Sequence, residues 1–454
     1  MKFILLFLTM LSLNACLLNP IVQQVLCTEK NNDSRDSLLF WLFLANQNYY
    51  VELNRNWAGI KKGQTLQLSA QYFVFGQNTS TSFQWSSSDV SVATVDQTGL
   101  VQGISNGKVS IIASTLDGRA SAVSAVSAVS VYSGYVYTTL NFIDSVGHLT
   151  MDEVSGVLTS NGTASVLPGS DPNGIVTDPG GKYLFTGDFG SGNISHFLIN
   201  QSTGALTANG NTIAGANPRN LVVTPNGKYV YLASEGTQSI RAFSINGDGT
   251  LTFINSFSTS IGHSQIQISR NGNFIFYLSQ NLTEVVSYRI NYNDGNLTLV
   301  GTSPTFANDG SGSIATHPNG IYLYVGSYPS ITILRFDSRS GNLSFVDSVL
   351  HSKTINGSAI HPNGRFYYTV DINNFSISGY SVDPNNGRIS LFQTLTGFVG
   401  SSLRFIIIEP AGRYAYVADN SGNIKHLNIN ESTGELTLVG TVNPGSAQWN
   451  LTFL

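Results

Sequence analysis

The chain has 454 residues, enough for two or three domains rather than one hydrophobic core. Charged residues make up 11% and aromatic residues 11%, with 45 glycines and only 3 methionines, a mixture that favours strands and tight turns. The net charge is −4 and the longest basic run is Lys61-Lys62. This composition excludes a phosphate-neutralising surface, so nucleic acid is not an expected partner.

The N-terminus carries a short apolar run, Phe3–Leu13, directly after Met1-Lys2. The run is too short to span a bilayer but suits the apolar region of a signal peptide. It ends at Leu13-Asn14-Ala15-Cys16, which resembles a bacterial lipobox, although Asn14 departs from the commonest small residue. The alternative is an ordinary secretory signal with an incidental cysteine. The resemblance implies cleavage before Cys16 and acylation of its thiol, with residues 1–15 as signal peptide and 16–48 as a lipid-anchored tether.

A lipid on Cys16 would make the membrane a partner of this chain. Each buried methylene contributes about 0.8 kcal/mol, so several acyl chains anchor strongly. The resemblance therefore implies a secreted chain held on the outer membrane, at the cell surface. Within the tether, Leu38–Ala45 is apolar but too short to cross a bilayer as a helix, and it is interpreted as a segment packed on a domain or in the membrane interface.

Cysteine and histidine usage argues against disulfides and metal. Cys16 and Cys27 are the only cysteines, and both precede the predicted folded region. The seven histidines do not fall at metal-ligand spacing with Cys, Asp or Glu. His317 and His361 share a repeated position before Pro-Asn-Gly, which favours a structural role. We expect no metal and no cofactor.

Residues 49–131 predict a small β-sandwich. Short alternating segments such as Thr65–Ala70 indicate half-buried strands, and frequent turns surround a central Trp85. The run Trp85–Asp89, followed by Val92-Ala93 and three later glycines, resembles the bacterial Ig-like group 2 family, with one extra serine. The resemblance implies a spacer or adhesion module without an active site.

From Gly134 to the end the chain repeats, and two markers give the period. The first is a turn that leads within two residues to an aromatic residue, at intervals of 44 to 48 residues. The second is a glycine turn that enters a strand, at intervals of 45 to 48 residues. The aromatic residues are Tyr135, Tyr183, Tyr229, Phe274, Tyr322, Phe366 and Tyr414, and the glycines are Gly156, Gly204, Gly249, Gly295, Gly341, Gly387 and Gly434.

About 46 residues with four strands is one propeller blade, so residues 134–454 predict a seven-bladed β-propeller. In one repeat the strands are expected at Leu221–Thr224, Tyr229–Ala233, Ser239–Ile245 and Leu251–Phe257. The first repeat lacks its first strand, whereas Trp449–Leu454 is an unused strand at the C-terminus. We therefore expect an all-β chain: an N-terminal Ig-like sandwich followed by a propeller that the C-terminal strand closes.

Strands such as Tyr183–Gly187 and Tyr229–Ala233 resemble the lactonase-type seven-bladed propellers, which include 6-phosphogluconolactonases and carboxymuconate-lactonising enzymes. The resemblance covers residues 134–454. Two of the site residues that it implies are present, Arg219 and Glu235. At the two others this chain has Asn173 in place of a histidine and Gln280 in place of an arginine.

These departures decide what chemistry is expected. Lactone opening needs a proton donor or acceptor and a cation for the negative charge. Arg219 and Glu235 could supply an anion clamp and a base, but the Asn173 amide cannot titrate. The competing interpretation is that Arg219 and Glu235 form a simple ion pair at the mouth of the channel. We expect no robust lactonase activity, while a small anion could still bind there.

Three functions remain open. The first is a surface-displayed lipoprotein that acts as a binding or adhesion platform for protein ligands, by resemblance to spirochaete surface lipoproteins proposed to bind host matrix or plasma proteins. The second is an extracytoplasmic lactonase of the 6-phosphogluconolactonase type. The third is a periplasmic scaffold lipoprotein.

Overall fold

The computed structural model describes residues 49–74, 77–115, 124–259, 264–279, 283–306, 312–373, 375–398, 402–446 and 448–454. Within these ranges the chain is all β apart from one short 3-10 helix, η1 (Asn141–Ile143). None of the helices in the described part is long and apolar enough to cross a membrane. The predicted signal peptide, the tether with Cys16 and the segment Leu38–Ala45 lie outside the described residues.

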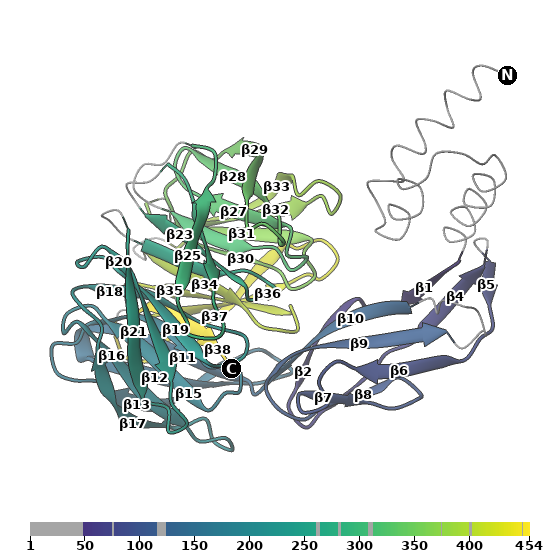
Figure 1. The fold of residues 1–454 in the computed structure, drawn as a ribbon, viewed down its shortest axis with the longest axis horizontal. Coiled ribbons are helices and arrows are strands. Elements are labelled where there is room, and N and C mark those ends of the chain that lie inside the picture. Colours follow the sequence, from purple (N-terminus) through teal and green to yellow (C-terminus); the bar gives the residue numbers. More distant parts are fainter. Residues whose placement is uncertain are drawn as a thin grey trace. The chain divides into compact units, whose positions relative to one another are not determined.

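The N-terminal domain consists of three small sheets (Figure 1). Their strand orders are β1-β4-β5, β2-β10-β9-β6 and β3-β8-β7, and β10 runs parallel to β2 with Ala128 opposite Trp57. The sequence predicted one strand at Thr65–Ala70, but the structure divides this segment between β3 and β4. The strands are β1 (Tyr49–Leu53), β2 (Trp57–Lys61), β3 (Thr65–Gln67), β4 (Ala70–Val74), β5 (Gln77–Thr79), β6 (Phe83–Ser87), β7 (Ala93–Val95), β8 (Leu100–Gly103), β9 (Gly107–Thr115) and β10 (Ser124–Tyr132).

Trp85 on β6 is the central buried side chain of this domain, as the sequence pattern indicated. Gly99 is one of the glycines of that pattern, and its surroundings explain why glycine is required there. Its φ is +84°, and a Cβ atom at this position would lie 2.5 Å from the carbonyl oxygen of Leu68 and 2.9 Å from the indole of Trp85. Only glycine satisfies both the left-handed backbone and the close approach of the indole.

The rest of the described chain forms seven four-stranded antiparallel sheets, which we call blades 1 to 7. Blade 1 contains β38 (Gln448–Phe453), β11 (Tyr135–Leu140), β12 (Ser145–Met151) and β13 (Leu158–Ser165). Blade 2 contains β14 (Pro172–Thr177), β15 (Tyr183–Asp188), β16 (Asn193–Ile199) and β17 (Leu206–Ile213). Blade 3 contains β18 (Pro218–Val223), β19 (Tyr229–Ser234), β20 (Ser239–Ile245) and β21 (Leu251–Ser258).

The remaining blades have the same strand order. Blade 4 contains β22 (Ser264–Ile268), β23 (Phe274–Ser279), β24 (Val286–Ile290) and β25 (Leu297–Thr302). Blade 5 contains β26 (Ser313–Thr316), β27 (Tyr322–Gly326), β28 (Ser330–Phe336) and β29 (Leu343–Leu350). Blade 6 contains β30 (Ile355–Ile360), β31 (Phe366–Asp371), β32 (Ser376–Val382) and β33 (Ile389–Leu395), and blade 7 contains β34 (Leu403–Ile408), β35 (Tyr414–Asp419), β36 (Ile424–Ile429) and β37 (Leu436–Val442).

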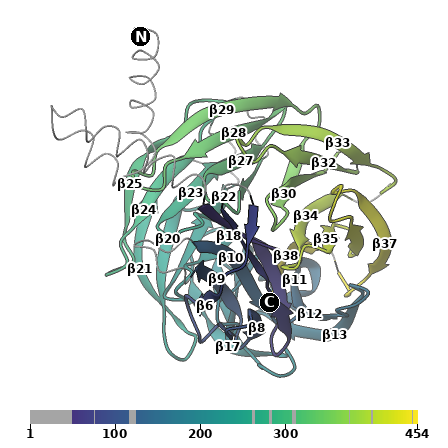
Figure 2. The same ribbon diagram turned by 90° about the vertical axis from the view of Figure 1, so that its right-hand side faces the viewer.

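The inner strands of the blades follow one another around a ring, with strands such as β29, β33 and β37 at its rim (Figure 2). The last strand, β38, pairs antiparallel with β11, with Val136 opposite Phe453, and contacts both β34 and β14. The C-terminal strand therefore occupies the inner position of blade 1 that the sequence left vacant. The seven inner strands are β38, β14, β18, β22, β26, β30 and β34.

The two sequence markers meet in space. The marker glycine of one blade packs against the marker aromatic ring of the preceding blade; Gly156 has φ +71°, and a Cβ there would lie 2.6 Å from the ring of Tyr414. In five blades the residue two positions after the marker aromatic is a tyrosine, which donates a hydrogen bond to the carbonyl of the marker glycine in the next blade. In blades 2 and 4 the residue at this position is phenylalanine, Phe185 and Phe276. The five bonds are Tyr137 to Gly204, Tyr231 to Gly295, Tyr324 to Gly387, Tyr368 to Gly434 and Tyr416 to Gly156, at 2.6 to 2.9 Å.

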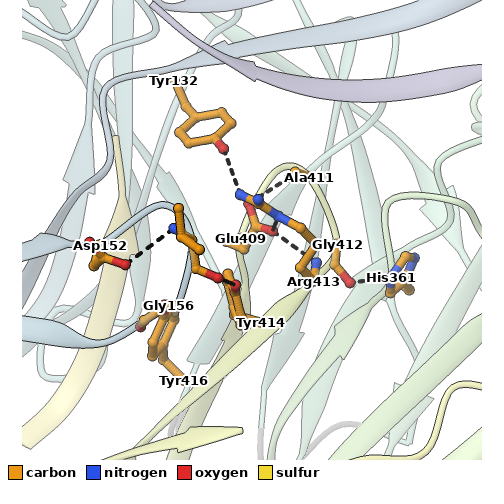
Figure 3. Close-up of polar contacts among 11 residues, drawn as sticks. Tyr132, Asp152, Gly156, His361, Glu409, Ala411, Gly412, Arg413, Tyr414 and Tyr416 are labelled. Atoms are coloured by element: carbon orange, nitrogen blue, oxygen red, sulfur yellow. Dashed lines mark hydrogen bonds and ion pairs between the residues drawn. The ribbon is translucent and has the colours of Figure 1, made fainter. Parts of the chain in front are cut away.

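Figure 3 shows this arrangement between blades 7 and 1. The Tyr416 hydroxyl donates to the Gly156 carbonyl at 2.6 Å, and the neighbouring Tyr414 hydroxyl donates to Val154 in the same turn. Beside them, Arg413 forms an ion pair with Glu409 at 3.2 Å and donates to the hydroxyl of Tyr132, the last residue of β10. These contacts hold the turn between β34 and β35 of blade 7 against blade 1 and against Tyr132.

The repeated histidines link neighbouring turns. His317 binds the Gly364 carbonyl through Nε2 at 2.8 Å and accepts a bond from the Asn319 amide at Nδ1. His361 makes the same pair of bonds with Gly412 and Asn363. Both imidazoles are buried, and their ring nitrogens are occupied by backbone groups. The structural role predicted for them is confirmed.

Candidate functional site at the channel mouth

The two ends of the propeller differ in what they contain. We call the end where each inner strand begins the mouth end; because the strands are antiparallel, the loops after the second and fourth strands lie there too. The opposite end, which carries the Pro-Asn-Gly turns and the marker glycines, is the turn end. Arg219 and Asn173 stand at the beginning of β18 and β14, so both belong to the mouth end.

Five inner strands have an irregular pairing at their beginning. In β14, β18, β30, β34 and β38 the register shifts just after the first strand residue, which leaves one residue, or two in β18 and β38, out of the regular pairing at a β-bulge. A bulge re-aims the side chain of its extra residue and is frequent beside binding sites. In blades 2, 3, 6 and 7 the bulge begins at the residue ten positions before the marker aromatic of the blade: Asn173, Arg219, Asn356 and Arg404. The sequence pattern predicted that this strand begins at Leu221, three residues late, because the bulge breaks the alternation of the strand.

Arg219 is held by two neighbours. Its Nε donates to Glu235 Oε2 at 2.7 Å, and its guanidinium carbon lies 4.2 Å from the centroid of the Phe189 ring in blade 2. The side chain of Arg219 is 13% exposed and that of Glu235 is 29% exposed. The ion pair predicted from the sequence is therefore present. Among the described residues no hydrogen-bond partner is seen for the two terminal amino groups of Arg219, so they remain available to a ligand.

The two positions at which this chain differs from the family pattern are Asn173 and Gln280. Asn173 is half-buried on β14, whose neighbour in the ring is β18, so it lies beside the strand that carries Arg219. Its amide can donate or accept a hydrogen bond but cannot exchange a proton at neutral pH. Gln280 lies outside the described residues.

Arg404 is a further residue of the mouth end that was not predicted from the sequence. It lies on β34 of blade 7 and is half-buried, and its pKa is lowered by burial and by the positive charge of Arg219. Arg404 lies in blade 7 and Arg219 in blade 3, which are three positions apart in the ring of seven blades. The position was visible in the sequence: Arg404 precedes Tyr414 by ten residues, as Arg219 precedes Tyr229.

One carboxyl group near the mouth titrates close to neutrality. Asp188, at the end of β15 and next to Phe189, is fully buried and accepts hydrogen bonds from Thr186 and Ser195. Burial raises its pKa to about 7, against the effect of these two bonds. Since both oxygens of Asp188 are engaged within its own blade, we assign it a structural role.

The mouth end combines cationic side chains with amides. Arg219 and Arg404 lie on the inner strands β18 and β34, and Asn173 and Asn356 lie on the neighbouring inner strands β14 and β30. Glu235 is the one carboxylate bonded to Arg219 in the described structure. The residues that the structure describes contain no group of three His, Cys, Asp or Glu side chains that could hold a metal ion.

The fold and site define a class: a seven-bladed propeller with cationic side chains at its mouth end, in one chain with an Ig-like domain. The model of the family described as "Lactonase, 7-bladed beta-propeller" matches residues 208–357 and 351–449, together more than half of the chain, and that of "Bacterial Ig-like domain (group 2)" matches residues 50–126. The chain therefore belongs to the lactonase seven-bladed β-propeller family and carries a bacterial Ig-like group 2 domain. The resemblances to the Ig-like group 2 family and to the lactonase-type propellers are confirmed.

Individual relatives are distant. A 6-phosphogluconolactonase of Pectobacterium carotovorum is 33% identical over 88 residues, 18% of this chain, and the match spans only 26% of that relative's length. A periplasmic gluconolactonase of Pseudomonas aeruginosa superposes with a TM-score of 0.63 at 16% identity, covering 70% of this chain and 98% of the other. A protein from Lactobacillus plantarum gives a TM-score of 0.62 at 17% identity, covering 70% and 98%. At these identities the structural likeness shows the fold alone.

Proposed function

We propose that the propeller binds a small organic anion of the sugar-acid class at its mouth and does not turn lactones over at enzymatic rates. The observation that carries the proposal is Arg219. Its guanidinium is fixed by Glu235 and Phe189, and its terminal amino groups have no partner in the described part of the chain. A fixed planar fork of this kind binds carboxylate or phosphate in two-point fashion.

The same geometry argues against efficient catalysis. Opening a lactone requires a group that gives or takes a proton at the reacting oxygen. Asn173 replaces the histidine that the family resemblance implies, and Glu235 is bound to Arg219. Loss of a general acid or base typically lowers the rate by about 10²- to 10⁴-fold.

A thermal-shift and calorimetric screen of sugar acids against the purified propeller-containing chain tests binding. We expect a sugar acid to raise the melting temperature of the wild type. Arg219→Gln should weaken the affinity by about tenfold or more, because a charged hydrogen bond contributes about 1.5–3 kcal/mol. Arg388→Gln, which removes an exposed cation paired with Asp347, is the matched control and should bind like the wild type. Equal affinity of the wild type and Arg219→Gln would contradict the proposal.

Family membership favours one alternative, a lactonase. The direct assay measures turnover of 6-phosphogluconolactone and carboxymuconolactone by the wild type and by Arg219→Ala. We expect rates near background for both proteins. Turnover at ordinary enzyme rates that disappears in Arg219→Ala would establish the lactonase in place of a binding protein.

We further propose that the chain is displayed on a membrane through Cys16, with binding of host proteins as a role of the displayed surface. The lipobox-like junction Leu13–Cys16 supports the anchor, and the Ig-like domain supports a spacer role. Labelling with radioactive palmitate compares the wild type with Cys16→Ser. Equal label in both proteins would contradict the proposed anchor. Surface proteolysis of intact cells then separates display from a periplasmic scaffold, because only a displayed chain is cut.

A further inference from the structure

Three blades end their second strand with a buried aspartate at the mouth end. The residue five positions after the marker aromatic is Asp188 in blade 2, Asp371 in blade 6 and Asp419 in blade 7, and it is serine or leucine in the other blades. All three aspartates are fully buried. A carboxyl group in such surroundings needs a cation or a proton to offset its charge.

Blades 6 and 7 supply a cation. Asp419 Oδ2 lies 3.3 Å from Lys425 Nζ on β36. In blade 6, Asp371 Oδ2 lies 3.5 Å from Lys353 Nζ, and Asp371 Oδ1 lies 2.8 Å from His351 Nε2. In both blades the buried carboxyl group therefore has a basic side chain as its neighbour.

Asp188 has no basic neighbour of this kind. Its oxygens accept hydrogen bonds from Thr186 at 2.7 Å and from Ser195 at 2.5 Å, and both donors are uncharged hydroxyl groups. Among the described residues no Lys, Arg or His side chain forms an ion pair with Asp188. Burial, together with the like charge of Asp144, raises the pKa of Asp188 to about 7. Near neutrality this carboxyl group therefore takes a proton in place of a cation.

The register of the strands shows which residue is missing in blade 2. In blade 7, Lys425 on β36 lies opposite Val417 on β35. In blade 2 the same two positions are occupied by Ser195 on β16 and Thr186 on β15. Ser195 therefore occupies the position from which a lysine pairs with the aspartate of blade 7.

Charged and titratable side chains at the mouth end of the neighbouring elements complete the surroundings of Asp188. Among the described residues they are Asp144 after η1, Asp171 before β14, the ion pair of Arg219 with Glu235 in blade 3, and His196 on β16. Asp144 and Asp171 are joined, since the Asp171 amide donates to Asp144 at 2.9 Å. His196 lies opposite Phe185 and therefore on the other face of the blade from Asp188.

The strand end that carries Asp188 also supports Arg219. Phe189 follows Asp188 directly, and its amide donates to the Asp171 carbonyl at 3.1 Å. The ring of Phe189 lies 4.2 Å from the guanidinium carbon of Arg219. A charge on Asp188 therefore affects the mouth in two ways. It adds negative charge near Arg219, which lowers the affinity for an anion, and it destabilises the strand end that holds Phe189.

We infer that Asp188 is a proton-dependent switch of the mouth: the protonated carboxyl group maintains the arrangement of Phe189 and Arg219, and its ionisation weakens anion binding. The inference rests on the proposed function and adds a regulatory role to the structural role of Asp188. Anion affinity is highest while Asp188 holds its proton and falls as rising pH removes it. By linkage, a bound anion promotes proton uptake by Asp188.

A measurement without ligand tests the switch. The Nε–H signal of Arg219 is followed by NMR in the full chain labelled with isotopic arginine, from about pH 5.5 to about pH 8.5, and is identified by its absence in Arg219→Gln. We expect the signal to shift with a midpoint near neutrality in the wild type and to stay constant in Asp188→Asn. Ser195→Lys, which restores the cation found in blade 7, should lower the midpoint by about one pH unit or more.

Two safeguards accompany the variants. Asp248→Asn removes an exposed carboxylate at the turn end and is the control, so its Arg219 signal should titrate like that of the wild type. Each variant is checked for cooperative melting, and if Ser195→Lys does not fold, Asp188→Asn alone decides. A constant Arg219 signal in the wild type, or the same pH dependence in Asp188→Asn, overturns the inference.

Calorimetry with gluconate measures the consequence for binding. The wild type should bind gluconate about threefold or more tighter at about pH 6 than at about pH 8, whereas Asp188→Asn should bind it equally at both. Equal affinity of the wild type at the two pH values overturns the inference and leaves anion binding intact. A titrating Arg219 signal without any binding of gluconate overturns the proposed function and leaves the switch in place.

Discussion

The two ends of the propeller are built from the same repeat but behave differently. At the turn end the blades are nearly interchangeable, because each contributes a marker glycine that packs on a marker aromatic ring of the preceding blade. At the mouth end the corresponding position changes from blade to blade: Asn173, Arg219, Ser264, Gly312, Asn356 and Arg404. Packing between neighbours imposes the same residues on every blade, whereas a ligand in the channel would meet each blade differently. The turn end of this propeller therefore maintains the fold, and the mouth end is where we propose that a ligand binds.

The largest effect is expected from removing residues 449–454, because this strand runs from the mouth end to the turn end of blade 1. Leu451 and Leu454 are buried, and the Leu454 amide donates to the Tyr135 carbonyl at 2.8 Å. Loss of two buried leucines and a row of strand hydrogen bonds should cost about 5 kcal/mol or more of the free energy of unfolding, and the exposed edge should promote aggregation. Thermal unfolding and size-exclusion chromatography measure both. A truncated chain that melts with the wild type and stays monomeric would show that β38 is dispensable.

Gly156→Ala tests the packing between blades at the turn end. The φ of Gly156 is +71°, and the new Cβ would lie 2.6 Å from the Tyr414 ring, so backbone strain and overpacking should together cost about 3–4 kcal/mol. Gly210→Ala is the matched control, because Gly210 has φ +96° but nothing within 4 Å of its would-be Cβ. We expect Gly210→Ala to show only the backbone strain, about 1–2 kcal/mol. Equal losses in the two variants, measured by denaturant unfolding, would mean that the ring contact contributes nothing.

Asp188→Asn tests the charge buried near the mouth. The folded-state pKa of Asp188 is raised to about 7, so its contribution to stability is fully present below the ordinary carboxyl pKa and is lost as pH rises through 7. For the wild type this group should lower the free energy of unfolding by about 2–3 kcal/mol between pH 5 and pH 8. Asp188→Asn should remove that decline, because the amide does not ionise.

The control for this experiment is Asp248→Asn at the turn end. Asp248 is exposed, and its pKa is lowered by its hydrogen bonds with Thr250. We expect this variant to keep the wild-type decline between pH 5 and pH 8. A decline that persists in Asp188→Asn would assign the pH dependence to another group.

The smallest effect is expected from Tyr416→Phe. The substitution keeps the ring but removes the hydrogen bond to the Gly156 carbonyl, at a cost of about 1 kcal/mol. Blades 2 and 4 already carry phenylalanine at this position, as Phe185 and Phe276, which indicates that the ring matters more than the hydroxyl. Tyr50→Phe, at an exposed position, is the control and should be neutral. A loss several times larger would show that the hydroxyl, not the ring, secures the link between blades 7 and 1.

The sequence by itself determined the architecture. Two markers recurring at intervals of 44 to 48 residues gave the number of blades, and the vacant first strand predicted the partner of the C-terminal strand. These features were readable because neighbouring blades pack through the same contacts each time, so the same residue types recur at the same spacing. The Ig-like domain was readable for a similar reason, since Trp85 and Gly99 fit each other through one short-range contact.

Only part of the candidate site could be predicted from the sequence. Arg219 and Glu235 were found by resemblance, and their ion pair by chemistry. Arg404 was not predicted because it is 185 residues from Arg219 in the chain, and only the ring of inner strands puts β18 and β34 into one propeller. The bulges that aim these side chains break the strand alternation and so conceal the start of the inner strands. The repeat fixes what each blade shares with its neighbour, whereas tertiary structure alone decides which residues from distant parts of the sequence come to lie at the same end of the propeller.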